Sequence, residues 1–155
     1  MLIATEDDLE ALLSLEKACF TSDQLSRHAF SRLLNRTGAR IYIEKKGDQI
    51  IASAVLLFRK NSKCARLYSF AVSPLLQQKG LGKIFLSQIE AELAKICEEI
   101  RLEVRTDNNK AISFYQKFGY VTFAKQENFY EDGETAFKMK KNIRCKVKQN
   151  EIEKA

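Results

Sequence analysis

Residues 72–97 read VSPLLQQKGLGKIFLSQIEAELAKIC, and this stretch decides the fold. Pro74, the only proline, marks the end of the apolar segment before it, because proline cannot donate a hydrogen bond to a strand ladder. Apolar residues then recur at helical spacing, which predicts a helix over residues 80–97. The loop at 76–83 therefore leads from a strand directly into the N-terminus of a long helix.

This loop, residues 76–83, is predicted to bind a phosphate group. The first turn of a helix offers N–H groups without partners and the positive end of the helix dipole. Gly80 and Gly82 allow a close approach to the main chain, and two neighbouring lysines add positive charge. A Walker loop would need Ser or Thr at Ile84, and a dinucleotide fingerprint would need glycine at Phe85. The alternative is that both glycines only shape the turn.

The segments on either side of the loop predict an α/β fold with the element order β-α-α-β-β-β-α-β-α-β-β. Amphipathic spacing predicts helices over residues 4–18, 26–35 and 108–118. Alternating or continuous apolar residues between turn signals predict strands over residues 39–44, 50–58, 64–72, 100–105, 120–124 and 135–140, and a very short strand precedes the helix at 4–18. The strand–helix–strand crossover in the middle implies a mixed sheet with helices on both faces.

Composition and charge predict one domain, residues 1–141, followed by a basic and flexible tail, residues 142–155. The chain has 155 residues, 45% of them hydrophobic and 30% charged. Seven Lys or Arg against two Glu lie in residues 138–155, so this segment carries +5 of the net charge of +6. Proteins that bind nucleic acid spread cations and aromatic residues over a folded face. We therefore expect no nucleic-acid partner, with binding through the tail as the alternative.

The cysteines and the hydropathy pattern predict a cytoplasmic protein without a metal site. The four cysteines are far apart, there is no CxxC pair, and the chain has a single histidine, which excludes a zinc site and a disulfide scaffold. No apolar run approaches the roughly 18–20 residues that cross a bilayer, and the N-terminus is acidic where a signal peptide would be basic. We expect neither secretion nor a membrane partner.

Two spaced motifs resemble the GNAT acyltransferase superfamily. Val72-Ser73-Pro74 followed by Gln77-x-x-Gly80-x-Gly82 is similar to the acetyl-CoA pyrophosphate loop of that family. A second set of segments is similar to the C-terminal half of that family's sequence: LEVR at 102–105, Asn108-x-x-Ala111-Ile112, and FYQKFGY at 114–120. More narrowly, the chain resembles bacterial ribosomal-protein N-terminal alanine acetyltransferases and other protein Nα-acetyltransferases. The resemblance implies a GNAT-like mixed sheet of about seven strands flanked by about four helices.

The resemblance also implies an activity: transfer of acetyl from acetyl-CoA to a primary amine, most specifically the N-terminal α-amine of a protein or peptide. Glu103 would be the base and Tyr115 the acid, in a direct attack. Phe129 and Tyr130, together with Glu103, would contact the acceptor. The implied acetyl-CoA site comprises Phe70, Ala71, Val72, Gln77, Gln78, Lys79, Gly80, Leu81, Gly82, Lys83, Asn108 and Tyr115.

The residue pattern around Glu103 leaves a second role open. Glu103 alternates with apolar residues of its strand and shares a face with Arg101 and Arg105. A carboxylate there either serves as a general base or forms a structural ion pair with one of these arginines. For Asn108 the alternative role is a helix N-cap, and for Tyr115 it is packing.

The residue pattern leaves more than one class of acceptor open. An α-amine has a reference pKa of about 7.7–8.0 and lysine about 10.4, so a single mild base suits the α-amine better. Gln78 stands where the family loop commonly has Gly or Arg, and Thr135 and Phe129 also depart from the Nα-acetyltransferase pattern. A small-molecule amine acetyltransferase and a non-catalytic CoA-binding module are the alternatives. We expect a monomer or a homodimer.

Overall fold

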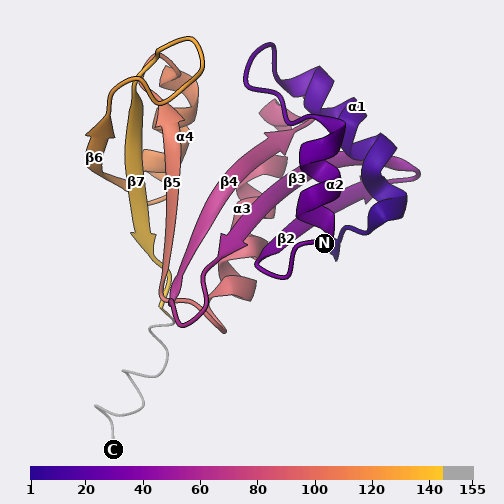
Figure 1. Ribbon diagram of the computed structural model, residues 1–155, viewed down its shortest axis with the longest axis horizontal. Coiled ribbons are helices and arrows are strands. Elements are labelled where there is room, and N and C mark those ends of the chain that lie inside the picture. The colour runs from indigo at the N-terminus through magenta and orange to yellow at the C-terminus, as the bar shows by residue number, and fades with distance from the viewer. Residues whose placement is uncertain (145–155) are drawn as a thin grey trace, which may run out of the picture.

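The strands and helices follow the predicted order along the chain (Figure 1). The computed structural model describes residues 1–144. The strands are β1 Leu2–Ile3, β2 Ala39–Lys46, β3 Gln49–Phe58, β4 Cys64–Val72, β5 Glu99–Arg105, β6 Val121–Gln126 and β7 Ala136–Asn142. The helices are α1 Leu9–Cys19, α2 Arg27–Leu34, α3 Leu81–Leu93 and α4 Asn109–Lys117, with short 3₁₀ turns at Glu6–Asp8 and Gln77–Lys79.

In the described residues, seven strands form one mixed sheet in the order β1-β2-β3-β4-β5-β7-β6. β4 and β5 pair in parallel, and the other neighbours pair in antiparallel. The parallel pair is the one joined by α3, as a strand–helix–strand crossover requires. Within residues 1–144, the predicted α/β fold, a mixed sheet of seven strands with four helices, is confirmed.

Two hydrophobic cores lie on opposite faces of the sheet. α1 and α2 cover one face of β2–β4 and bury a core that includes Leu12, Phe30 and Val55. α3 and α4 cover the other face with a larger core around Leu86, Ile89, Ile100, Leu102 and Met139. On β5 the apolar residues all face this larger core, so the charged residues of β5 face the side where α1 and α2 lie.

β4 and β5 pair over only part of their length. Their ladder runs from Cys64 to Leu67 of β4, although β4 continues to Val72. Just beyond it, β3 pairs with Ser69 and then directly with Leu67, which leaves Tyr68 as an extra residue on β4. Such a bulge bends a strand and increases its twist. Figure 1 shows β4 and β5 diverging toward the end of the sheet where the α1–α2 and β6–β7 loops lie.

Several boundaries differ from the sequence prediction, and the first helix begins at Leu9 and not at residue 4. α3 ends at Leu93 and not at residue 97, because Lys95 and Ile96 bond three residues back and the last turn tightens. β7 continues to Asn142, and Ile143 is buried against the larger core. Residues 145–155 of the predicted tail lie outside the described residues. Within residues 1–144, no helix is long and apolar enough to span a bilayer.

Candidate active site

The turn between β4 and α3 presents main-chain N–H groups at the start of a helix. Gly80 has φ +79°, a conformation that other residues adopt only with strain. The first helical hydrogen bond runs from the Ile84 N–H to the Gly80 carbonyl, at 3.2 Å. The N–H groups of residues 81–83 therefore have no acceptor within the helix, and together with the helix dipole they can hold an anion.

Gln77 fastens this turn to its surroundings through its side chain. Its Nε2 donates to the Val72 carbonyl at 3.0 Å, and its Oε1 accepts from the Lys110 ammonium at 2.9 Å. Gln78, Lys79 and Lys83 are exposed beside the turn, where they can face an anion from solvent. The fold thus brings all the predicted loop residues to one helix end, and Lys110 adds a cation that the sequence reading missed.

The end of β4 has one free edge. The Ser73 N–H donates to the Ile51 carbonyl at 2.8 Å, and Val72 pairs with Ala52 at the next position of the antiparallel ladder. Because adjacent pairs alternate in such a ladder, the N–H and C=O of Val72 point away from β3. The carbonyl accepts from Gln77 and from the Cys19 thiol, the latter at 3.2 Å. The N–H is thus left for a ligand in the space where β5 has diverged.

Glu103 lies on the open face of β5, with 16% of its side chain exposed. Its Oε2 accepts from the Arg66 Nε at 3.0 Å, and within the described residues its Oε1 makes no hydrogen bond. Glu103 does form an ion pair, as the alternative predicted, but the predicted partners, Arg101 and Arg105, are wrong. Arg101 pairs with Glu99 and Arg105 with aspartates, so Glu103 pairs across to β4.

Tyr115 is buried on the other side of the sheet, in α4. Its ring packs edge-on against Phe114 and Tyr120, with centroids 5.3 and 5.6 Å away, and against Phe70 of β4 at 6.4 Å. Within residues 1–144 its hydroxyl makes no hydrogen bond. Burial, with a smaller contribution from Tyr130, raises the pKa of Tyr115 well above its usual value. Tyr115 is therefore a neutral phenol at neutral pH, with a proton to donate.

Asn108 caps α4. Its Oδ1 accepts from the Ala111 N–H at 3.1 Å, which confirms the N-cap role expected from the sequence. The amide nitrogen of Asn108 is not part of this bond and can contact a ligand. Both roles expected for Asn108 are therefore compatible.

Phe129 and Tyr130 lie in the β6–β7 loop with their rings edge to face, centroids 4.9 Å apart. The Arg105 guanidinium lies over the Tyr130 ring at 4.9 Å. The pKa of Tyr130 is raised to about 12, mainly by burial and to a smaller extent by the nearby charge of Glu103. The loop thus carries its aromatic pair to the same end of β5 as Glu103.

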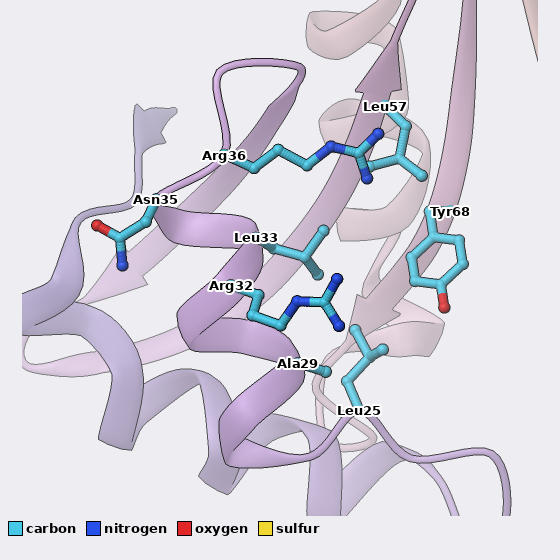
Figure 2. Close-up of a pocket in the computed structure, with 8 residues that line it drawn as sticks. All are labelled: Leu25, Ala29, Arg32, Leu33, Asn35, Arg36, Leu57 and Tyr68. Carbon is cyan, nitrogen blue, oxygen red and sulfur yellow. The ribbon is translucent and has the colours of Figure 1, made fainter.

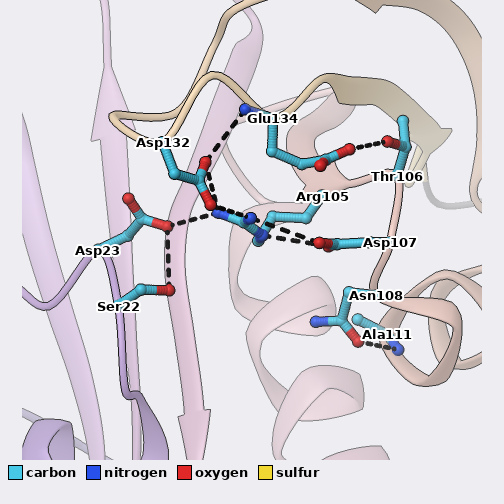
Figure 3. A network of polar contacts seen from close by, with 9 residues as sticks. All are labelled: Ser22, Asp23, Arg105, Thr106, Asp107, Asn108, Ala111, Asp132 and Glu134. Carbon is cyan, nitrogen blue, oxygen red and sulfur yellow. Dashed lines mark hydrogen bonds and ion pairs between the residues drawn. The ribbon is translucent and has the colours of Figure 1, made fainter.

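Arg105 joins three segments that are far apart in the sequence (Figure 3). It pairs with Asp23 of the α1–α2 loop at 2.9 Å, with Asp132 of the β6–β7 loop at 2.5 Å, and with Asp107 after β5 at 3.1 Å. Only 20% of the Arg105 side chain is exposed, and the guanidinium holds the pKa of Asp132 below its usual value. Sequence reading missed this cluster, because no local signal pairs residues 82 positions apart.

Comparison with known proteins places this geometry among acetyltransferases. The model of the acetyltransferase (GNAT) family matches residues 9–120. A Bacillus subtilis (strain 168) protein, provisionally named a ribosomal protein bS18-alanine N-acetyltransferase, is 28% identical over 136 residues, covering 86% of this chain and 88% of its own length. The catalytic subunit of the N-terminal acetyltransferase A complex of Arabidopsis thaliana is 26% identical over 152 residues, covering 95% of this chain and 78% of its own length.

A solved structure agrees with these relatives. The crystal structure of the ribosomal-protein-S18-alanine N-acetyltransferase from Escherichia coli matches with a TM-score of 0.80 and 26% identity. The match covers 93% of this chain and 94% of that chain. The similarity therefore extends over nearly the whole of both chains.

Proposed function

Because the chain belongs to the GNAT family of acetyltransferases, we propose that it transfers an acetyl group from acetyl-CoA to the N-terminal α-amine of a protein or peptide. The observation that carries the proposal is the arrangement around the free edge of β4. Glu103 lies on one face of the sheet and Tyr115 on the other, at the point where β4 and β5 diverge. Two relatives support this acceptor class, because one is named as an N-terminal acetyltransferase subunit and the other as a ribosomal-protein alanine N-acetyltransferase. A cytoplasmic location belongs to the same proposal.

The residues at the β4–α3 turn suit acetyl-CoA. The N–H groups of residues 81–83 would hold the pyrophosphate, with Lys79, Lys83 and Lys110 adding charge. The free edge of β4 at residues 70–72 would pair with the pantetheine arm, and Asn108 would contact it. When bound, acetyl-CoA supplies a thioester carbonyl that is open to attack by an amine.

Glu103 and Tyr115 divide the proton transfers between them. The free Oε1 of Glu103 accepts the proton of the attacking amine, directly or through one water, as the N–C bond forms. The Val72 N–H donates to the carbonyl oxygen and stabilises its developing charge. As the C–S bond breaks, Tyr115 donates its proton to the sulfur.

Arg66 has a supporting role in this arrangement. It holds Glu103 by its Oε2, which restricts rotation of the carboxylate and leaves Oε1 to accept a proton. Its positive charge balances the largely buried carboxylate, which would otherwise be costly. The ion pair and the base role are therefore compatible.

A panel of acceptors tests the proposal. Release of the CoA thiol is measured with short peptides that have a free N-terminus, with the same peptides N-blocked but carrying lysine, and with small amines such as polyamines and amino acids. We expect turnover on the free α-amines. Turnover confined to small amines would instead establish the small-molecule alternative, and acetyl-CoA binding without turnover on any amine would establish a non-catalytic module.

The same assay tests the base. Glu103→Gln should lower kcat by about 10²-fold or more, with the acetyl-CoA Kd nearly unchanged. Glu99→Gln is the matched control, because Glu99 lies on the same face of β5 and is held by Arg101. Equal turnover in the two variants would remove Glu103 from the base role.

A further inference from the structure

A pocket of about 550 Å³ lies between α2 and the exposed face of β3 and β4 (Figure 2). We call it the α2 pocket. The residues that line it are Leu25, Ala29, Arg32, Leu33, Asn35, Arg36, Leu57 and Tyr68. The mechanism above does not use this pocket.

Two arginines give the α2 pocket its charge. Figure 2 shows the guanidinium groups of Arg32 and Arg36 extending from α2 and the residues just after it toward Leu57 and Tyr68. Within the described part of the chain, neither guanidinium forms an ion pair, and no acidic residue lines the pocket. Arg27, on the same helix, is instead held by Glu10. The pocket therefore combines apolar walls with two cations that face no anion among residues 1–144.

Side-chain contacts on β4 link the α2 pocket to Glu103, where the acceptor amine is proposed to lie. Tyr68 lines the pocket, and the Arg66 guanidinium lies over the Tyr68 ring at 5.3 Å. Arg66 in turn holds Glu103 at 3.0 Å. An extended peptide advances about 3.3–3.6 Å per residue. A peptide whose amine lies at Glu103 and which crosses Tyr68 would therefore bring one of its next few side chains to the two arginines.

We propose that the α2 pocket binds an acidic side chain at position two, three or four of the acceptor peptide, so that the enzyme prefers acidic N-terminal sequences. The inference rests on the proposed function and adds the substrate class. A carboxylate can form a bidentate, charge-assisted contact with a guanidinium, and the apolar walls accommodate the methylene groups of Asp or Glu. A lysine in the same place would be repelled by both arginines.

The test uses the full chain and a set of matched peptides with Asp, Asn or Lys at position two, three or four. At one of these positions, kcat/KM should be about tenfold higher for Asp than for Asn, and lower still for Lys. The preference should decrease as salt is added, because the contact is only partly buried. The double variant Arg32→Glu/Arg36→Glu should reverse the order and favour Lys.

Arg27→Glu is the matched control, since it changes the same charge on the same helix outside the pocket. It should keep the preference for Asp, and all variants should keep the acetyl-CoA Kd. Equal kcat/KM for the Asp, Asn and Lys peptides, or an unchanged order in the double variant, would overturn the inference while leaving peptide acetylation intact.

Calorimetric titration of the same peptides measures the pocket without turnover. Tighter binding of the Asp peptide than of the Lys peptide, lost in the double variant, supports the α2 pocket even if no peptide is acetylated and the proposed function fails. Equal affinity of the two peptides overturns the inference whichever amine is acetylated.

Discussion

The two sides of the proposed site are held together by different kinds of contact. The donor side, residues 72–83, is one continuous segment whose binding groups are main-chain N–H groups at a helix start. The acceptor side, formed by the α1–α2 and β6–β7 loops around Arg105, is assembled from side chains of three distant segments. Glu103 and Tyr115 lie between these two sides.

This difference predicts how each side responds to substitution. Main-chain N–H groups persist when a side chain changes, so the donor side is sensitive only where the backbone needs a particular residue, as at Gly80. The acceptor side depends on charges, and partly exposed ion pairs are individually weak. It should therefore lose function gradually as its ion pairs are removed.

The largest effect on activity should come from a substitution at Tyr115, between the donor and acceptor sides. Tyr115→Phe removes a hydroxyl that makes no hydrogen bond within residues 1–144, so the melting temperature should change little while kcat falls by about 10²–10⁴-fold. Tyr120→Phe is the control, because its hydroxyl donates to Glu90 at 2.9 Å. That variant should lose about 1–3 kcal/mol of stability and keep most of its activity. Equal kcat in the two variants would contradict the acid role of Tyr115.

A backbone change should break the donor side alone. In Gly80→Val a branched residue is forced to φ +79°, so the turn should relax and the Kd for acetyl-CoA should rise about tenfold, the equivalent of 1–2 kcal/mol of strain. Gly47→Val carries similar strain at φ +63° in the β2–β3 turn. It should lower the melting temperature without changing the Kd. A matching loss of affinity in both variants would mean that the Gly80 turn is not the anion site.

A charge change should break the acceptor side alone. Arg105→Gln removes the contacts to Asp23, Asp107 and Asp132, and the acceptor KM should rise about three- to fivefold as the two loops separate. The acetyl-CoA Kd should stay the same. Arg101→Gln, a change on the same face of β5, should leave both constants unchanged. If Arg105→Gln altered kcat with KM unaffected, Arg105 would not be positioning these loops.

The smallest effect concerns the anchor of the α1–α2 loop. Glu16 is 3% exposed and accepts from the Leu25 N–H at 2.9 Å, and burial raises the pKa of its carboxyl. Between its unfolded pKa and this raised value the folded state binds more protons, so the free energy of unfolding decreases as pH rises through that window.

Glu16→Gln keeps an acceptor for Leu25 and removes the buried charge. Its stability at pH 7 should rise by up to about 1 kcal/mol, or about 2–4 °C in Tm, and the gain should vanish below about pH 4. Thermal melts of both proteins across pH 4–8 measure this. A gain that persisted at pH 4 would show that the Glu16 charge is not its cause.

The sequence by itself determined the features that depend on neighbouring residues. The strand, turn and helix of the donor side, the cap at Asn108 and the face on which Glu103 lies all follow from local spacing. Each needs only a backbone conformation or a strand alternation that a few adjacent residues specify.

Only the tertiary structure decided which side chains meet. Glu103 had two arginines on its own strand, yet it pairs with Arg66, 37 positions away. Arg105 is joined to Asp23 across 82 positions, and the α2 pocket combines residues of α2 with Tyr68 of β4. These contacts depend on the parallel register of β4 and β5, the bulge at Tyr68 and the packing of two loops. They are products of the whole fold, and no local sequence pattern specifies them.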